Sequence, residues 1–186
     1  MAITLHLGDI TADDRAEAIV NAANSSLLRG GGVDGAIHDA AGPALLEECR
    51  LIGGCPTGEV RVTGAGRLGA RCIIHAVGPV FAGGARGESE LLGSCYHAAI
   101  EAAAAHGCAT VALPAISTGA YGYPLDGAAA VAVGAVDAAM RAHDTVREAR
   151  FWLFDERAYG AFTVALDALS TTPTRAGAGG ASRRAS

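Results

Sequence analysis

Two glycine-rich segments are the features of the sequence best suited to holding a ligand. The first spans residues 28–35 and contains Gly30, Gly31 and Gly32, and the second spans residues 117–124. Each is expected to join a strand to a helix, and free backbone N–H groups and the helix dipole favour an anion at a helix N-terminus. Glycine has no Cβ, so the backbone can approach such a ligand closely. The pair predicts a two-sided cradle for a pyrophosphate.

The charge of the chain points to the same kind of contact. The formal charge is −5, every basic residue is an arginine, and three of the arginines follow Ser170, so residues 1–169 carry −8. An acidic surface is a poor general binder of nucleic-acid backbone. The absence of lysine excludes Schiff-base, lysine-nucleophile and Walker-type chemistry. An anion would therefore be held by backbone N–H groups or by a few arginines.

Several polar residues near these segments have both a structural and a functional interpretation. Asp9 follows an expected strand and is either a turn residue or an acceptor for a ligand N–H group. Asn21 and Asn24 are equally compatible with turns and with ligand binding. Tyr121 lies within a glycine segment, where an aromatic ring gains little from core packing, and this favours a functional role.

Asp34 and His38 are four residues apart, a spacing that puts them on one face of a helix. Asp34 alone is also typical of a helix N-cap, and His38 alone of a structural histidine. We interpret His6, His75 and the five cysteines as structural.

A third glycine-rich run, residues 64–69, matches the GxGxxG spacing of dinucleotide sites. That motif requires a helix after it. Residues 71–77 instead have the apolar character of a strand, so we expect a turn between two strands.

The pattern of apolar residues predicts alternating strands and helices. Strands are expected at residues 3–7, 18–22, 59–63, 72–77, 110–113 and 150–154. Helices are expected at residues 34–41, 44–52, 88–106, 124–143 and 156–169, with a capping box at residues 11–14 that begins a further short helix. This order predicts a three-layer α/β/α domain with a mixed central sheet.

The length of 186 residues fits one domain over residues 1–169, and the small and polar residues of 170–186 predict a disordered tail. The N-terminus lacks the features of a signal peptide, and no apolar run approaches the ~20 residues of a membrane span. The cysteines include no Cys-x-x-Cys pair, so we expect reduced thiols, a cytoplasmic location and no metal site.

Seven segments occur in order along the chain and together resemble the macrodomain family, within it the MacroD-type ADP-ribosyl hydrolases. They are residues 8–11, 20–25, 30–38, 40–42, 55–59, 74–79 and 116–124. The resemblance extends from about residue 3 to about residue 169. It implies a macrodomain that removes mono-ADP-ribose from Asp and Glu side chains of proteins and deacetylates O-acetyl-ADP-ribose, without a cofactor. ADP-ribosylated nucleic-acid ends are a further class of target.

The resemblance also implies a role for individual residues. Asp9 accepts the adenine amino group beside the Ile10 backbone, and Phe154 packs on the adenine. The pyrophosphate is held by backbone N–H groups of residues of both glycine segments: Gly32, Val33, Ser117, Thr118, Gly119, Ala120 and Tyr121.

The remaining implied roles concern the reaction. Asn24 binds the distal ribose, which carries the leaving group, and Tyr121 forms a wall beside it. Asp34 positions or partly deprotonates the attacking water, and His38 either orients Asp34 or packs beneath it. Asn24, Asp34 and His38 favour catalysis, because binding alone does not need them.

Two other functions remain open at this point. The same pocket could belong to a reader module that binds ADP-ribose without turnover, or to an unrelated phosphate-binding enzyme such as a nucleotide phosphatase. A chain-cleaving poly(ADP-ribose) glycohydrolase is disfavoured, because its adjacent glutamates are replaced here by the run from Asp34 to His38.

Overall fold

The fold is a three-layer α/β/α domain, seen here in a computed structural model that describes residues 1–171. The strands are β1 (Ala2–Leu7), β2 (Ala18–Ala22), β3 (Val60–Gly64), β4 (Cys72–Ala76), β5 (Thr110–Pro114) and β6 (Glu148–Leu153). The helices are η1 (Ile10–Ala12), α1 (Gly32–Ala41), α2 (Pro43–Ile52), α3 (Glu88–Ala105), α4 (Leu125–Ala142) and α5 (Glu156–Thr171).

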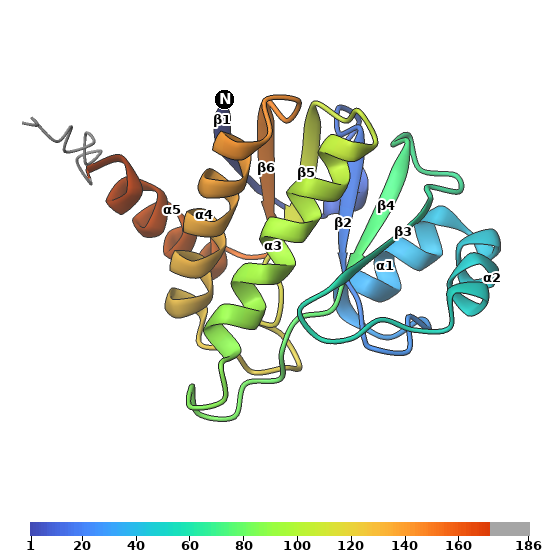
Figure 1. The fold of residues 1–186 in the computed structure, drawn as a ribbon, viewed down its shortest axis with the longest axis horizontal. Helices are drawn as coiled ribbons and strands as arrows, with labels where there is room; N and C mark the ends of the chain where they lie inside the picture. The colour runs from blue at the N-terminus through green and yellow to red at the C-terminus, as the bar shows by residue number, and fades with distance from the viewer. Residues whose placement is uncertain (172–186) are drawn as a thin grey trace, which may run out of the picture.

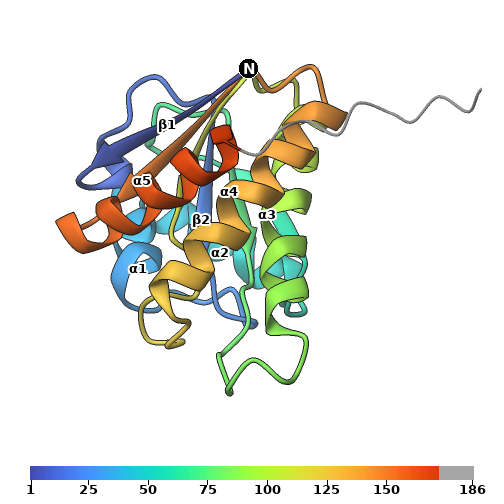
Figure 2. The ribbon, with the colours of Figure 1, turned by 90° about the vertical axis from the view of Figure 1, so that its left-hand side faces the viewer.

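Within the described part of the chain, the six strands form one mixed sheet in the order β1-β6-β5-β2-β4-β3. All neighbouring strands run parallel except β3, which runs antiparallel to β4. Helices α3, α4 and α5 cover one face, while α1, α2 and η1 cover the other (Figures 1 and 2). The predicted fold class, three layers around a mixed sheet, is confirmed.

The central strands are apolar on both sides because both faces of the sheet are covered. Val20 of β2 and Ile74 of β4 pack beneath α3 and α4. Ile19 and Ile73, one position earlier in the same strands, pack beneath α1 and α2. Side chains of successive strand residues point to opposite faces, so a polar residue beside these positions is buried under one helical layer or the other.

The chain order creates a crevice at the carboxyl ends of the strands. From β2 the chain passes to β3 and β4 on one side and then returns to β5 on the other side of β2. The segments that follow β2, β4 and β5 gather at the lower edge of the sheet in Figure 1. In α/β proteins this switch point is where ligands bind. Both glycine-rich segments therefore reach the same edge.

The predicted elements are confirmed with small shifts at their ends. The predicted capping box at residues 11–14 is wrong: the N-cap of η1 lies two residues earlier, at Asp9, which accepts a hydrogen bond from Thr11 N at 2.9 Å. Asp13 instead caps the turn that follows, where its carboxylate accepts bonds from the Arg15 and Ala16 N–H groups. Asp9 lies between the end of β1 and the start of η1, so its carboxylate can reach the N–H groups of the first turn. This position favours Asp9 as the cap.

Three further expectations concern the rest of the chain. The GxGxxG run does join two antiparallel strands, β3 and β4, as a turn. Helix α5 continues to Thr171, and the remainder of the expected tail, 172–186, lies outside the described residues. In residues 1–171, no helix is both long and apolar enough to cross a membrane.

One buried tyrosine connects α3 to the segment that follows β5. The Tyr96 hydroxyl donates a hydrogen bond to the Pro114 carbonyl and accepts one from the Ile116 N–H group, both at 2.9 Å. Tyr96 is fully buried, so no water can replace these bonds. The hydroxyl thus fixes the backbone at the start of the second glycine-rich segment.

We predict that Tyr96→Phe lowers the free energy of unfolding by about 1–3 kcal/mol, because two buried backbone groups lose their partner. Urea denaturation measures the change. Tyr159→Phe is the matched control, since the Tyr159 hydroxyl has no hydrogen bond within the described residues. Equal midpoints for the two variants would contradict the prediction.

Candidate ligand-binding and catalytic site

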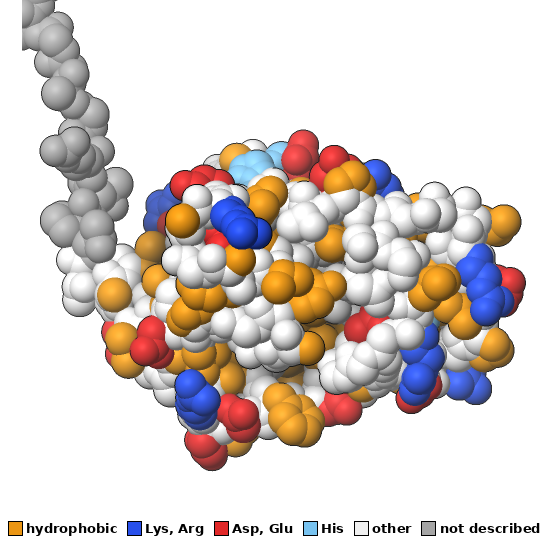
Figure 3. All heavy atoms as spheres, turned by 90° about the horizontal axis from the view of Figure 1, so that it is seen from below, with side chains coloured by type: hydrophobic (Ala, Val, Ile, Leu, Met, Phe, Trp, Pro, Cys, Tyr) orange, Lys and Arg blue, Asp and Glu red, His pale blue; other side chains and the backbone are white. Residues whose placement is uncertain are grey.

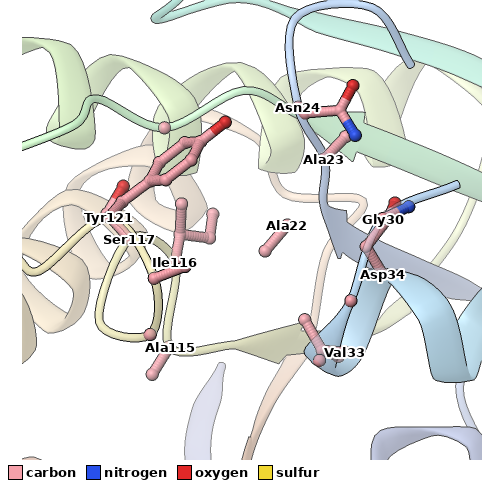
Figure 4. Close-up of a pocket in the computed structure, with 15 residues that line it drawn as sticks. Ala22, Ala23, Asn24, Gly30, Val33, Asp34, Ala115, Ile116, Ser117 and Tyr121 are labelled. Carbon is pink, nitrogen blue, oxygen red and sulfur yellow. The ribbon is translucent and has the colours of Figure 1, made fainter. Parts of the chain in front are cut away.

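A cavity of about 420 Å³ opens at the carboxyl edge of the sheet, between the segments that follow β2 and β5. Its lining residues come from those two segments and from the start of the segment after β4: Ala22, Ala23, Asn24, Gly30, Gly31, Gly32, Val33, Asp34, Gly78, Ala115, Ile116, Ser117, Gly119, Ala120 and Tyr121. Figure 4 shows Tyr121 and Ile116 on one side, facing Asn24, Asp34 and Val33 on the other. Residues of both glycine-rich segments therefore line one cavity from opposite sides.

The first side of the cavity is the N-terminus of α1. Its N-cap, Gly31, makes no side-chain capping bond, and Gly32 has a left-handed backbone with φ of +59°. The N–H groups of Gly32 and Val33 belong to the first turn, where no carbonyl inside the helix can accept from them. These donors face the cavity and are available to an anion.

The second side is the segment after β5. Ser117 is buried, with a backbone φ of +68°, an uncommon conformation for a residue with a side chain. Its hydroxyl has no hydrogen-bond partner within residues 1–171. Hydrogen bonds inside the segment come from Gly122 N and Tyr123 N, whereas the N–H groups of residues 117–121 donate none within the described residues. The strained turn leaves a row of unpaired donors.

An anion in the cavity would meet these backbone donors, because the arginine side chains lie elsewhere. Figure 3 looks onto this edge of the molecule, where the middle of the face is mostly backbone, uncharged polar and hydrophobic atoms, and where most arginine and acidic side chains lie around it. Arg29, which follows the first segment's start, is paired with Asp39 on α1 through two bonds of 2.9 and 2.7 Å. No arginine belongs to the described lining of the cavity.

The carboxylate of Asp34 is the one charged group in the cavity lining of the described chain. The side chain is almost fully buried. One oxygen, Oδ2, accepts a hydrogen bond from Gly30 N at 2.5 Å, and the other, Oδ1, accepts one from Asn21 Nδ2 at 2.7 Å. Two donors from separate segments thus fix the orientation of the group.

Asn24 stands beside Asp34 across Gly30. Its Nδ2 donates to the Leu28 carbonyl at 2.6 Å, and its Oδ1 accepts from the N–H and hydroxyl groups of Ser26. One Nδ2 proton therefore remains for a ligand, since a side-chain amide has two.

On the opposite side of the cavity, the Tyr121 carbonyl accepts a hydrogen bond from Phe81 N. This bond connects the second glycine-rich segment to the segment after β4.

His38 lies behind Asp34 and not in the cavity lining. Its Nε2 is 3.6 Å from Asp34 Oδ1, and neither ring nitrogen has a hydrogen-bond partner within the described residues. Because 4% of His38 is exposed, it can influence a ligand only through Asp34. The sequence left two roles open for His38, packing beneath Asp34 and orienting it. The position of the ring is compatible with both roles.

One group of potential metal ligands occurs in the described chain. The ligand atoms of His38, Cys49 and His75 lie within 4.8 Å of one another, all buried. Burial lowers the pKa of His75 to about 4 and raises the pKa of Cys49 to about 11. Both nitrogens of His75 already have hydrogen-bond partners, Asn21 and Thr63. A metal ion bound at His75 Nε2 would have to displace Thr63. Hydrogen bonding therefore explains the grouping of these side chains better than metal binding does.

The structure places the predicted residues in two groups. Eight of them line the cavity: Asn24, Gly32, Val33, Asp34, Ser117, Gly119, Ala120 and Tyr121. The other five do not: Asp9, Ile10, His38, Thr118 and Phe154. The Thr118 hydroxyl instead donates to the Ala115 carbonyl at 2.9 Å.

The residues expected at the adenine follow β1 and β6, the two strands that lie on the side of β5 away from β2. Asp9 follows β1 and is exposed, and one of its oxygens, Oδ1, is occupied by Thr11. The side chain of Ile10 is buried in the core beneath α1. Phe154 follows β6 with 86% of its surface exposed, which leaves the ring free to stack on a planar group.

Sequence reasoning missed Gly78 and assigned no role in the site to Asn21 and His75. A Cβ at Gly78 would lie 2.2 Å from Ser117 Oγ and 2.5 Å from Ile116 Cγ2, so the two backbones meet only because this residue is glycine. Asn21 and His75 are fully buried. Each is a polar residue in an otherwise apolar strand. This pattern was the one signal in the sequence that could have predicted a hydrogen bond between two buried polar side chains.

A doubly covered sheet with a backbone-lined crevice at its switch point defines a class of nucleotide-binding α/β domains. Within it, the sequence profile of the Macro domain family matches residues 20–132. A Macro domain-containing protein of Mesorhizobium japonicum is 51% identical over 90% of this chain and 94% of its own length. One from Chlorobaculum tepidum is 50% identical over 90% and 95%. The chain belongs to the Macro domain family.

Solved structures lead to the same family. The Oceanobacillus iheyensis macrodomain with ADP matches with a TM-score of 0.84 and 41% identity, covering 89% of this chain and 90% of that one. The Trypanosoma brucei macrodomain in complex with ADP-ribose matches with a TM-score of 0.82 and 39% identity, covering 88% of this chain and 68% of that one. The resemblance noted in the sequence is thereby confirmed at the level of the family.

We predict that Gly78→Ala lowers the free energy of unfolding by about 1–3 kcal/mol, because the added methyl group overlaps Ser117 and Ile116 and forces the second segment to move. Gly119→Ala is the matched control, since a Cβ there meets no atom within 4 Å. Chemical denaturation of both variants measures the difference. A Gly78 variant as stable as the Gly119 variant would refute the close approach.

Proposed function

We propose that this macrodomain is a hydrolase that removes mono-ADP-ribose from Asp and Glu side chains of proteins and deacetylates O-acetyl-ADP-ribose. The observation that carries the proposal is the buried carboxylate of Asp34, fixed at the end of a cavity whose other walls are unpaired backbone donors. Membership of the family and the relatives solved with ADP and with ADP-ribose support the choice of ligand.

The diphosphate of ADP-ribose lies between the two glycine-rich segments. The N–H groups of Gly32 and Val33 approach it from the helix N-terminus, and those of residues 117–121 approach it from the opposite side. Each wall holds donors that make no internal bond, so the ligand supplies the missing acceptors. Uncharged donors suit a chain whose body is acidic and contains no lysine.

The adenine lies beyond β5, near the ends of β6 and β1. The free Oδ2 of Asp9 accepts from the amino group of the base beside the Ile10 backbone, while Oδ1 continues to cap η1. The exposed ring of Phe154 stacks on the base. This places the other end of the ligand, the distal ribose, beside Asn24, Asp34 and Tyr121.

The reaction replaces an ester by a carboxylic acid and an alcohol. Water is added, the ester C–O bond breaks, and ADP-ribose separates from the Asp or Glu side chain or from acetate. An ester needs little activation of the leaving group, so positioning the water and the ribose supplies most of the rate enhancement. Water is the nucleophile, so the step requires no nucleophilic side chain and no covalent intermediate on the protein.

Asp34 acts on the water mainly by orienting it. Gly30 N and Asn21 Nδ2 each take one lone pair of the carboxylate, and the remaining lone pairs accept hydrogen bonds from the water or a ribose hydroxyl. The free Nδ2 proton of Asn24 binds another ribose hydroxyl, and Tyr121 closes the opposite side. His38 supports Asp34 from behind.

A reader that binds ADP-ribose without turnover is the alternative function. The diphosphate and adenine contacts would serve a reader equally well. A buried carboxylate beside the bound ribose would not serve a reader, because it adds a desolvated negative charge to a site that binds an anion. ADP-ribosylated proteins are the proposed partners, and ADP-ribosylated nucleic-acid ends are a second class to include in substrate tests.

We predict that Asp34→Ala lowers kcat/KM for release of ADP-ribose from a glutamate-modified protein by at least about 100-fold. The dissociation constant for ADP-ribose should stay within about fivefold, since binding rests on the backbone donors. Product analysis measures kcat/KM, and calorimetry measures the dissociation constant. Asp39→Ala, an exposed position on the same helix, is the control and should keep full activity. Wild-type protein that binds ADP-ribose but releases none would establish the reader instead.

We predict that Asp9→Asn weakens ADP-ribose binding about 10- to 100-fold, because an amide N–H group replaces the acceptor that faces the adenine. The substitution retains the oxygen that caps η1, so the fold is preserved. Binding of ribose 5-phosphate, which has no base, should not change. An equal loss for both ligands, or no loss for ADP-ribose, would place the adenine elsewhere.

A further inference from the structure

A row of buried polar side chains runs through the core directly behind Asp34. Asn21 of β2 and His75 of β4 are register partners on neighbouring parallel strands, and both face the layer of α1 and α2. Asn21 Nδ2 lies 2.7 Å from Asp34 Oδ1 and 3.1 Å from His75 Nδ1. His75 Nε2 lies 2.9 Å from the Thr63 hydroxyl, which donates to the Gly64 carbonyl at 3.0 Å.

The directions of these hydrogen bonds determine one another. Asp34 can only accept when ionised, so the Asn21 amide must present its NH₂ group to the carboxylate. The second proton of that NH₂ group then points at His75 Nδ1, which must be an acceptor without a proton. His75 is therefore the neutral Nε2–H tautomer, and its N–H group donates to Thr63.

The amide of Asn21 depends on His75 for its orientation. Its Oδ1 is fully buried and has no hydrogen-bond partner within the described residues. The amide is consequently held by its two N–H bonds, one to Asp34 and one to His75. Without the acceptor at His75 Nδ1, the Asn21 side chain could rotate, and Asp34 Oδ1 would lose its fixed donor.

We propose that His75 is a positioning residue of this site: its unprotonated Nδ1 locks the Asn21 amide, which in turn fixes the Asp34 carboxylate toward the ligand. The inference rests on the proposed hydrolase function of the cavity. β4 contributes no side chain to the cavity lining of the described chain. Through His75, however, this strand takes part in orienting the water.

The surroundings of His75 favour the neutral ring. The side chain is fully buried, and burial together with the nearby His38 ring holds its pKa near 4. Cys49 Sγ is 3.7 Å from Nε2, on the side of the ring that faces Thr63 and away from Asn21. A protonated ring would direct a second N–H group at the Asn21 amide and break the bond to it.

The first test uses wild-type protein and needs no activity. Long-range ¹H–¹⁵N NMR spectra of the histidines, assigned with a His75 variant, report which nitrogen bears the proton. We expect His75 at pH 7 to be the Nε2–H tautomer. An Nδ1–H tautomer or an imidazolium would overturn the proposal, whatever the protein hydrolyses.

The second test compares two isosteric substitutions. His75→Asn puts an amide oxygen at the place of Nδ1 and keeps the acceptor for Asn21, whereas His75→Gln reaches the place of Nε2 and removes that acceptor. We expect His75→Gln to lower kcat at least about tenfold through misplacement of Asp34. KM should stay within about twofold. His75→Asn should restore most of the loss.

The outcomes separate positioning from stability and from the proposed function. Denaturation midpoints are measured for both variants, because each replaces a buried ring. Equal kcat values for the Gln variant and wild type, or equal losses in both variants, would overturn the role of His75. If wild-type protein shows no hydrolysis, the proposed function fails, and the NMR result alone decides whether the hydrogen-bonded row exists as described.

Discussion

The position of one buried carboxylate governs how this site is built. Asp34 lies at the first turn of α1, where the helix dipole favours a negative charge, yet its side chain is removed from water. Two hydrogen bonds offset that desolvation, one from Gly30 in the preceding segment and one from Asn21 in the central strand. The carboxylate therefore has one orientation, set jointly by the helix, the glycine segment and the sheet.

The rest of the cavity follows from a shortage of cationic side chains. An acidic body without lysine has few cations to offer an anion, and no arginine lines the cavity in the described chain. Backbone donors without an internal hydrogen bond are left in two places instead. Both places use a left-handed backbone conformation, which glycine adopts freely at Gly32 but which is strained at Ser117 because of its side chain. The close approach at Gly78 and the hydroxyl of Tyr96 then hold the strained segment at Ser117 where it is. Sites for ligands commonly retain such strain because the surrounding structure fixes it.

Most of the architecture could be predicted from local sequence because each element has a clear pattern. β2 and β4 are short apolar runs, and α2 starts with Pro43 and is followed by Gly53, a C-cap with a left-handed conformation. The start of η1 was mispredicted because Asp9 and Thr11 are both good capping residues, and only the direction of the chain after β1 selects between them. Local sequence also did not specify the partner of Arg29, since Asp39 lies ten residues away on α1.

The sequence by itself determined the family, the order of the elements and most of the residues of the two glycine-rich segments that line the cavity, because these depend on local spacing and on backbone preferences of single residues. Tertiary structure alone decided which polar groups meet behind the cavity. In the sequence His75 was typical of a structural residue, and Asn21 was equally compatible with a turn and with ligand binding. The parallel register of β2 and β4 puts the two side chains next to each other beneath α1. Hydrogen bonds between residues 13 and 54 positions apart require the strands and helices to be packed, and no local pattern specifies them.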